Sequence, residues 1–257
     1  MNEIIEYFDH TQYKQARPSY PPKVFEIIAK HLKCLPVKNI VDVGCGSGQA
    51  SFGLLNYGEH VLGIDLSPVQ IQGAREEILR RKIDPNRIDF QISGSNAIPV
   101  EDHSVDLLTV AQAIHWFDLE EFYKEAKRVL VPGGSAAIWC YDMARVMNND
   151  TVERAFSNLH SGILKNYWTK HRELVDNGYK DLNPPFKHVE RFQAILEHST
   201  DIEGLLVYIG TWSSVHEYKK AHPDQDCCAD LKKVLDACAP DTVFQLQSTI
   251  HMLLVRD

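Results

Sequence analysis

The sequence has no long apolar run and no leader of the kind that directs export. A membrane-spanning helix needs about 18 or more consecutive apolar residues, and no such run occurs in the 257 residues. The first residues, MNEIIEYFDHTQYK, are polar and acidic, without the basic start and apolar stretch of a signal peptide. We therefore expect a cytoplasmic protein that does not bind membranes.

The cysteines and histidines lack the spacings that mark a zinc site or a disulfide framework. The six cysteines include no CxxC pair, and the twelve histidines include no HExxH and no Cys/His cluster. The cysteines are Cys34, Cys45, Cys140, Cys227, Cys228 and Cys238. We therefore expect a reducing compartment and no metal.

Positive charge is also scarce. The net charge is -8 at pH 7, and the Lys and Arg residues are dispersed rather than gathered into a patch that a phosphate backbone would need. We therefore expect no nucleic-acid partner. The hydrophobic content of 44% is enough to bury a substantial core, in one large domain or one domain with an insertion.

Short β-branched runs alternate with amphipathic helical patterns between residues 38 and 142. Strand and helix alternating through short loops is typical of a parallel sheet covered by helices on both faces. The sequence therefore predicts an α/β, Rossmann-like fold. The runs expected to form its strands are NIVDV (39–43), HVLGI (60–64), RIDFQI (87–92), VDLLTV (105–110) and SAAIWCY (135–141).

The segments outside this core are mostly helical in pattern and do not alternate strands with helices. Residues 1–37 predict an N-terminal helical arm, broken by the Pro-rich ARPSYPP, and residues 143–240 predict an inserted helical cap with one strand at VERFQAIL. Residues 241–257 contain two runs of strand character. The expected whole is a single domain, 1–257, with a seven-stranded, mostly parallel sheet and 38–142 as its cofactor-binding core.

A glycine-rich turn, VDVGCGSGQ, follows the first predicted strand and opens a helix. Glycine permits a tight turn and lets a ligand approach the backbone closely, and the helix beyond offers unsatisfied N–H groups. The second predicted strand ends at Asp65, about 20 residues on, where a carboxylate can accept both ribose hydroxyls of a nucleoside. The turn and the acid together predict a nucleoside cofactor, bound by Gly44, Cys45, Gly46, Gly48 and Asp65.

The glycine spacing separates two kinds of nucleoside. Dinucleotide-binding turns have the pattern G-x-G-x-x-G, whereas here the third glycine comes one residue early and Asp42 stands two residues before the first. This turn resembles the D/E-x-G-x-G-x-G of class I S-adenosylmethionine-dependent methyltransferases. The resemblance implies S-adenosylmethionine as cofactor, with the loop against its methionine end. An acid near the loop also suits a cationic sulfonium better than a pyrophosphate.

The same resemblance implies further cofactor contacts. GSNAIPVEDHSVDLL resembles the loop and fourth strand of these enzymes, where the adenine is recognised. Leu66, after Asp65, is expected to pack on the adenine ring or to be a core leucine, and Gln112 is expected near the methionine portion. The loop positions implied to meet the adenine are Ser95, Asn96 and Ala97.

The pattern Tyr123-x-x-x-Lys127 allows a rival interpretation, a nicotinamide-dependent oxidoreductase. A Tyr-x-x-x-Lys pair is typical of short-chain dehydrogenases, but residues four apart share a helix face in any helix. The Tyr123/Lys127 pair also follows the fourth strand, and the glycine turn lacks the G-x-G-x-x-G spacing of a dinucleotide-binding turn. The sequence therefore favours an ordinary surface helix.

A closer resemblance covers nearly the whole chain. FDHTQYKQARPSYP, AQAIHWFD, WTKHRELVDNGYKDLNPPF and YIGTWSSVHEYKKAHPD resemble the trans-aconitate methyltransferase type of small-molecule methyltransferase. AQAIHWFD leaves the fourth strand at the sheet edge where ligands bind. Trp116 can line the acceptor site with an indole donor or cap the core, and His115 can donate to the acceptor or take its proton.

The expected reaction is methylation of a small molecule, with a carboxylic acid converted to its methyl ester. A carboxylate needs donors that orient it and no base, and related carboxyl methyltransferases use a Gln and Trp pair, which points to Gln12 with Trp116. Further donors on the arm are Tyr13, Arg17 and Tyr20, although RPSYP can also be only a rigid connection.

Other interpretations stay open. If the acceptor is an amine or a hydroxyl, His115 or His10 is the candidate base. A cofactor-binding protein without catalysis is a further alternative, and we expect a monomer or a weak homodimer. Cap residues that can shape a pocket or simply pack are Trp168, His171, Arg172, Tyr179 and Trp212.

Overall fold

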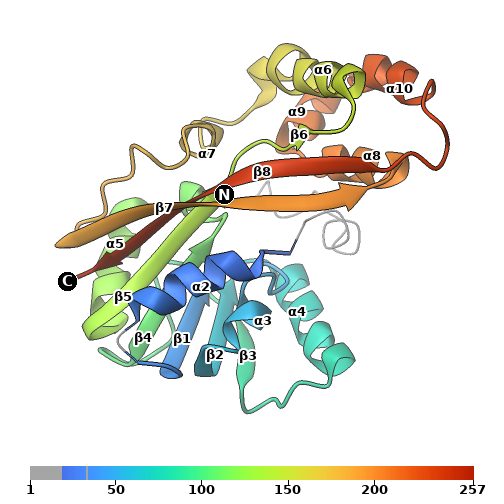
Figure 1. The fold of residues 1–257 in the computed structure, drawn as a ribbon. Helices are drawn as coiled ribbons and strands as arrows, with labels where there is room; N and C mark the ends of the chain where they lie inside the picture. The colour runs from blue at the N-terminus through green and yellow to red at the C-terminus, as the bar shows by residue number, and fades with distance from the viewer. Residues whose placement is uncertain (1–18, 33) are drawn as a thin grey trace. The chain divides into compact units, whose positions relative to one another are not determined.

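The computed structural model describes residues 19–32 and 34–257, which divide into two compact units (Figure 1). The sheet unit contains Ser19–Asp142, Leu174–Ala194 and Ile250–Asp257, and the helical unit contains Met143–Glu173 and Ile195–Thr249. The division of the sequence into an arm, a core, a cap and C-terminal strands stays a prediction, since its first 18 residues lie outside the described part.

One mixed sheet carries the fold, and the predicted Rossmann-like architecture is confirmed. Its strand order is β3-β2-β1-β4-β5-β8-β6, with β7 paired to β8. The neighbours from β3 to β5 are parallel, whereas β8 is antiparallel to β5 and to β6. The strands are β1 (Val37–Val43), β2 (Gly58–Asp65), β3 (Ile88–Ile92), β4 (Val105–Ala111), β5 (Leu130–Tyr141), β6 (Arg145–Val146), β7 (His188–Thr200) and β8 (Phe244–Arg256).

The strand order places the binding edge of the sheet. β1 lies between β2 and β4, so the chain leaves β1 toward one side and later returns to its other side. Ile40 of β1 is aligned with Val61 of β2 and with Leu107 of β4, and all three are fully buried. Ligands of open parallel sheets bind beyond the carboxyl ends of the strands at this reversal.

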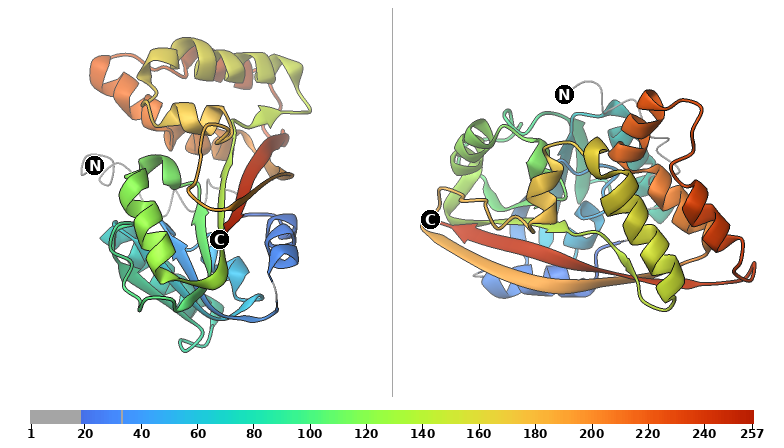
Figure 2. Two further views of the ribbon diagram at one scale, coloured as in Figure 1. Left: turned by 90° about the vertical axis from the view of Figure 1, so that its left-hand side faces the viewer. Right: turned by 90° about the horizontal axis from the view of Figure 1, so that it is seen from above.

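Helices cover both faces of the parallel strands, as the sequence predicts. α2 (Pro22–His31) and α5 (Leu119–Val129) lie on opposite faces of the sheet unit (Figure 2). α5 begins where the Asp118 carboxylate accepts hydrogen bonds from two backbone N–H groups of the first turn. It buries Phe122, Ala126 and Val129 in the sheet-unit core, and an aromatic side chain of this kind contributes about 1.5–3 kcal/mol by burial. The other helices of the sheet unit are α3 (Ser51–Leu54), α4 (Pro68–Arg81) and the 3-10 turn η1 (Ile114–Trp116).

The C-terminal segment differs from the sequence-based expectation. Two strand-like runs were expected in residues 241–257, but the structure has one strand, β8, of 13 residues. No Gly or Pro interrupts the segment, and Ser248 is buried in line with its alternating neighbours. β8 therefore continues without a turn, pairing with β6 at Leu246 and with β5 from Ile250 onward.

The helical unit has its own aromatic core. Trp212 is 4% exposed, and its ring centroid lies 5.5–5.7 Å from those of Phe156, His160, Trp168 and Tyr208. α10 packs beside α6 in this unit (Figures 1 and 2). Its elements are α6 (Asp150–Asn158), the π-turn η2 (Leu159–Ile163), the 3-10 turn η3 (Lys165–Tyr167), α8 (Ile202–Gly210), α9 (Ser213–Ala221) and α10 (Ala229–Leu235); α7 (Arg172–Asp176) begins in it and ends in the sheet unit.

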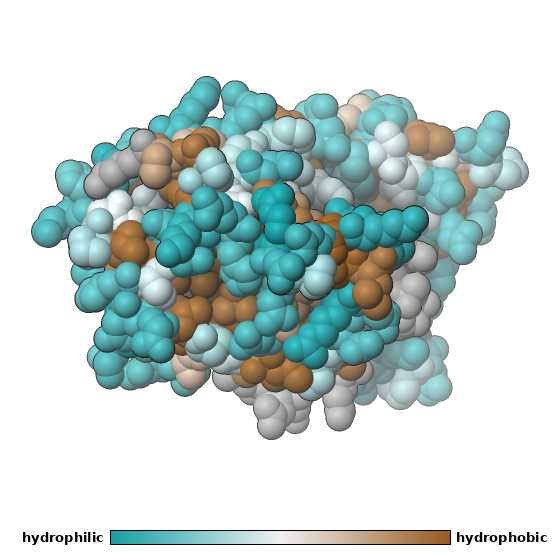
Figure 3. Space-filling model, turned by 90° about the horizontal axis from the view of Figure 1, so that it is seen from below, coloured by the Kyte–Doolittle hydropathy of each residue, from teal (hydrophilic) through white to brown (hydrophobic). Residues whose placement is uncertain are grey.

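The surface seen in Figure 3 is mostly hydrophilic, with hydrophobic residues lying among the polar ones. Large exposed hydrophobic side chains occur at separate places in the chain, such as Leu79 and Met147. Such side chains are normal on protein surfaces. No helix within residues 19–32 and 34–257 is long and apolar enough to cross a membrane.

Candidate active site

The glycine turn after β1 has a backbone that only glycine adopts without strain. Gly44, Gly46 and Gly48 have φ angles of +69°, +56° and +88°. A Cβ at Gly44 would lie 2.6 Å from the Cβ of Ala113, and one at Gly48 would lie 2.6 Å from the Phe52 ring. The glycines therefore permit the turn itself, and they let Ala113, two residues past the end of β4, lie close to the turn.

Asp65 ties this turn to the end of β2. One carboxylate oxygen, Oδ2, accepts from the backbone N–H of Gly46 at 2.9 Å, and Oδ1 accepts from that of Ser67 at 2.9 Å. Burial raises the pKa of the Asp65 carboxyl, while these two hydrogen bonds oppose the rise. The acid is therefore held beside the turn, at the place where the sequence predicts the ribose.

Asp42 is completely buried beneath the same turn. Its carboxylate accepts from the Ser51 hydroxyl at 2.5 Å and from the Thr109 hydroxyl at 2.8 Å. Burial raises the pKa of Asp42 to about 6, against the two hydroxyl hydrogen bonds. The side chain thus joins β1 to α3 and β4, and this geometry supports a positioning role for the predicted cofactor residue. Its neighbour Cys45 is also buried, which raises the pKa of the thiol.

Two buried polar atoms next to the turn have no hydrogen-bond partner among the described residues. They are the Ser47 hydroxyl oxygen and Oε1 of Gln70. The Gln70 oxygen lies 3.9 Å from the place where a Cβ of Gly46 would be. Buried polar atoms are normally satisfied, so the turn fits a polar ligand such as the methionine end of S-adenosylmethionine. Sequence reasoning missed Gln70, because its place above the turn depends on how α4 packs.

The predicted adenine residues lie at the carboxyl ends of β2 and β3. Leu66 is 44% exposed, and one of its methyl groups and the Asn96 amide oxygen both approach Gly94, at 3.5 Å and 2.7 Å from a Cβ built there. The loop that carries Ser95 and Ala97 is closed by a hydrogen bond from the Ala97 N–H to the Gly94 carbonyl. Leu66 is therefore placed as an exposed apolar residue beside Asn96 rather than as a core leucine.

Ile92 is a candidate that sequence reasoning missed. It is the last residue of β3, it is aligned with Asp65 of β2, and its side chain is 56% exposed. An exposed isoleucine beside Asp65, the acid predicted to bind the ribose, can cover an adenine ring. The signal was its position as the final residue of the strand next to Asp65.

Gln112 closes the end of the sheet. Its Oε1 accepts from the backbone N–H of Tyr141 at 2.8 Å, and its Nε2 donates to the Tyr141 carbonyl at 3.4 Å. Its backbone has φ +54°, unusual for a residue with a side chain. The amide extends the ladder between β4 and β5, and its predicted place near the methionine portion stays a prediction.

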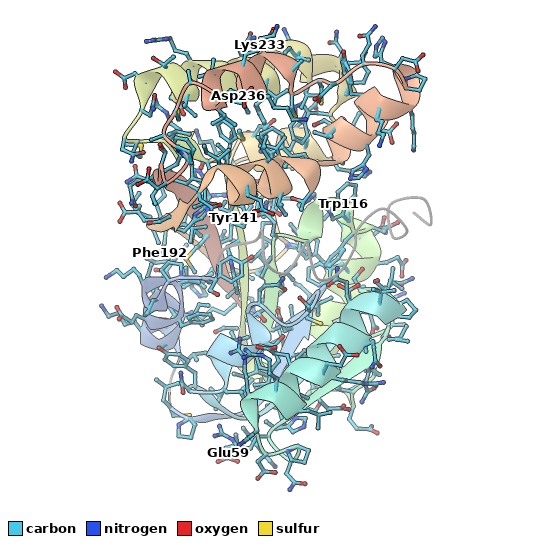
Figure 4. All side chains as sticks on the ribbon, turned by 90° about the vertical axis from the view of Figure 1, so that its right-hand side faces the viewer. Glu59, Trp116, Tyr141, Phe192, Lys233 and Asp236 are labelled. Atoms are coloured by element: carbon cyan, nitrogen blue, oxygen red, sulfur yellow. The ribbon has the colours of Figure 1, made fainter. Side chains whose placement is uncertain are left out.

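His115 and Trp116 lie in η1, directly beyond β4. Figure 4 shows Trp116 at the carboxyl end of the parallel strands, whereas Glu59 marks their opposite end. The two rings have centroids 5.1 Å apart; His115 is buried and Trp116 half-buried. Nδ1 of His115 lies 2.8 Å from the Tyr179 hydroxyl, also in the sheet unit. Of the predicted acceptor residues, these two therefore lie at the carboxyl edge of the sheet, and their role in binding the acceptor stays a prediction.

Tyr179 holds this histidine from a constrained position. It is fully buried with φ +56°, and its carbonyl accepts from the Arg191 guanidinium at 2.9 Å. The hydrogen bond with this hydroxyl fixes the ring orientation of His115. The other predicted pocket residues of the cap belong to the helical unit: Trp168, His171, Arg172 and Trp212.

Tyr20 is the one predicted arm residue within the described part of the chain. Its ring contacts Trp139 edge-on at 5.4 Å and Tyr141 at 6.3 Å between centroids. It therefore lies against the carboxyl end of β5. The other predicted arm residues lie outside the described residues: His10, Gln12, Tyr13 and Arg17.

The Tyr-x-x-x-Lys pattern does not form a catalytic pair. Tyr123 is buried, and burial raises the pKa of its hydroxyl to about 12, opposite to what a catalytic base requires. Lys127 lies 3.5 Å from the Asp257 carboxylate and over the Phe186 ring. The pattern is that of an ordinary amphipathic helix.

Comparisons with known proteins agree with this geometry. Residues 41–138 match the methyltransferase domain family. A protein of Dictyostelium discoideum named as a methyltransferase is 32% identical over 225 residues, covering 87% of this chain and 81% of that protein. The Saccharomyces cerevisiae protein CRG1, named as an S-adenosylmethionine-dependent methyltransferase, is 26% identical over 249 residues, covering 87% and 85%.

A solved structure extends the likeness over the whole fold. A protein from Anaeromyxobacter dehalogenans, named as a type II methyltransferase, superposes with a TM-score of 0.80 at 30% identity, covering 93% of this chain and 97% of that one. The chain belongs to the class I S-adenosylmethionine-dependent methyltransferases. It is an S-adenosylmethionine-dependent methyltransferase.

Proposed function

We propose that the enzyme methylates a carboxylate oxygen of a small organic acid, giving a methyl ester, as in the trans-aconitate type of methyltransferase that the sequence resembles. The observation that carries the proposal is the make-up of the segment beyond β4. His115 and Trp116 both offer N–H groups there, and His115 is held by the Tyr179 hydroxyl. The segment's one carboxylate, Asp118, accepts from its own helix instead.

This set of groups suits an anionic acceptor. When bound, S-adenosylmethionine supplies an electrophilic methyl group. A carboxylate carries no proton that must be removed, so the protein has to orient it and keep water away. The Trp116 indole and the His115 ring provide donors and apolar surface for this task. The turn and Asp65 hold the cofactor, with Ser47 and Gln70 offering polar atoms to its methionine end.

A cationic amine would require a different site. An amine acceptor is stabilised by carboxylates and needs a base for its proton. Within residues 111–118, the one acidic side chain is exposed and serves as a helix cap. Gln12 belongs to the proposal as the amide partner of Trp116, on the basis of the sequence resemblance. The Tyr13, Arg17 and Tyr20 side chains are proposed as further donors to the acid.

A label-transfer assay tests the acceptor atom. The purified enzyme is incubated with methyl-labelled S-adenosylmethionine and a small-metabolite extract, and half of the product is then treated with mild base. Methyl esters release labelled methanol under these conditions, whereas methyl amines and methyl ethers keep their label. We expect base-labile label. Base-stable label would overturn the carboxylate proposal and make His115 or His10 the candidate base.

A pair of variants connects the assay to the site. Tyr179→Phe removes the hydroxyl that holds Nδ1 of His115 and keeps the ring that fills the core. We expect KM for the acid to rise and its pH dependence to change, with unchanged cofactor affinity. Tyr123→Phe is the matched control, because it removes another buried hydroxyl of the sheet-unit core that has no partner among the described residues.

A further inference from the structure

The segment before α10 brings two adjacent thiols and a carboxylate together in the helical unit. The Sγ atoms of Cys227 and Cys228 are 3.8 Å apart, and each residue is 8% exposed. The ligand atoms of Asp226, Cys227 and Cys228 all lie within 4.8 Å of one another. We propose that these three residues bind a thiophilic divalent cation of the zinc type.

The separation of the sulfur atoms matches one kind of shared ligand. Two thiolates bound at about 2.3 Å to one tetrahedral ion are about 3.8 Å apart. A linear two-coordinate ion at the same bond length would hold them about 4.6 Å apart, and a disulfide requires about 2.05 Å. The observed 3.8 Å therefore fits a tetrahedral cation without movement of either side chain.

Asp226 is held in place as the third ligand. Its Oδ1 accepts from the backbone N–H of Cys228 at 2.9 Å, which fixes the carboxylate over the cysteine pair. Its Oδ2 lies 2.6 Å from the ammonium of Lys232, so this oxygen already faces a positive charge. Lys232 is 49% exposed at its side chain and can turn toward solvent. A cation bound by Oδ2 replaces that ammonium.

Charge and protons balance in this step. Each cysteine gives up its thiol proton as its sulfur bonds to the cation, so two protons are released to solvent and no electron is transferred. Sulfur ligands favour zinc over magnesium or calcium, which prefer oxygen. Three protein ligands leave one tetrahedral position for water or a small ligand. The sequence predicts no metal, because adjacent cysteines match neither the CxxC nor the HExxH spacing.

The bound ion would stabilise the helical unit. Cys227 and Cys228 belong to its hydrophobic core, and the helix that follows them packs on α6. Figure 4 labels Lys233, which follows Lys232 on α10, and Asp236, which directly follows the end of this helix. A ligand that binds only the folded state raises its stability in proportion to the logarithm of ligand concentration.

Cobalt(II) provides the probe for the site. The full-length protein, kept reduced, is titrated with Co(II) and then with Zn(II). We expect one equivalent of Co(II) to produce thiolate-to-cobalt charge-transfer absorption and the visible bands of tetrahedral cobalt, and Zn(II) to abolish both. Cys227→Ser and Cys228→Ser are expected to weaken binding about 100-fold or more. Cys238→Ser, another cysteine of the helical unit, is the matched control and is expected to bind normally.

Two surface variants keep the test independent of folding. Asp226→Asn removes the oxygen ligand and is expected to weaken Co(II) binding at least about tenfold. Lys232→Met removes the competing ammonium and is expected to strengthen it. Equal affinity in both variants would overturn the proposal, as would absence of the charge-transfer band or its persistence in the Cys227→Ser/Cys228→Ser double variant. A mass lower by two hydrogen atoms under reducing conditions, showing a disulfide, would overturn it as well.

Discussion

The buried carboxylate of Asp42 makes the stability of the protein depend on pH. In the native state burial raises its pKa to about 6, from an ordinary value of 3.8. The native state then binds more protons than the unfolded state between about pH 4 and pH 6. The contribution of this group to stability is fully present below pH 4 and is lost as the pH rises through 6.

The size of the effect follows from the two pKa values. Each pKa unit corresponds to about 1.4 kcal/mol, so the difference between 3.8 and about 6 corresponds to about 3 kcal/mol. Asp42→Asn removes the ionisation and keeps an oxygen that can accept from Ser51 or Thr109. We therefore expect the free energy of unfolding of the variant, relative to the wild type, to rise by about 2.4 kcal/mol between pH 4 and pH 7, the larger part of the whole effect.

Urea unfolding followed by far-ultraviolet circular dichroism at several pH values measures this difference. Shifted groups that do not interact with Asp42 are present in both proteins and cancel in the comparison, such as Glu125, whose pKa the Arg128 guanidinium lowers. Asp118→Asn is the control, because this exposed side chain keeps an oxygen for capping. Wild-type and Asp42→Asn curves that run parallel from pH 4 to pH 7 would refute the reasoning.

Three further substitutions test the turn, the ribose site and the acceptor segment. Gly44→Ala is expected to destabilise the protein by about 1–3 kcal/mol, because Gly44 has φ +69° and the new Cβ would lie 2.6 Å from the Cβ of Ala113. Gly210→Ala is the control, because there is open space around Gly210. Thermal unfolding should show this second variant to be as stable as the wild type or slightly more stable. Asp65→Ala is expected to weaken S-adenosylmethionine binding about 10–100-fold in calorimetry, and unchanged affinity would contradict the ribose assignment. Trp116→Ala is expected to reduce turnover while leaving cofactor affinity nearly intact; equal loss of both would show that Trp116 is structural.

The sequence was most informative where a local pattern determines the backbone. The glycines of the turn were predicted correctly as positions of tight backbone, because a positive φ depends on the residue itself. The parallel strands and the amphipathic α5 were also predictable, since burial imposes a period on the sequence. The fold class could therefore be predicted from local patterns, each of them no longer than one strand or one helix.

Features that depend on distant residues were not predictable in the same way. Nothing near Asp42 in the sequence shows that Thr109, 67 residues away, would meet its carboxylate. Gln112 is another example, because its amide pairs with the backbone of Tyr141, 29 residues later. β8 was divided incorrectly because polar residues within it resembled a turn, although their alternation continues through the strand.

The contact between Gly44 and Ala113 explains why a histidine and a tryptophan stand at the exit of a core strand. Gly44 belongs to the turn that is predicted to hold the cofactor, and Ala113 directly precedes the 3-10 turn that carries His115 and Trp116. Because Gly44 has no side chain, the two backbones approach so closely that even a methyl group would collide with Ala113. A movement of the turn must therefore move the segment beyond β4. The residues that we propose to orient the acceptor thus lie beside the turn that is predicted to bind the methyl donor, and an in-line transfer requires the two to be held close together.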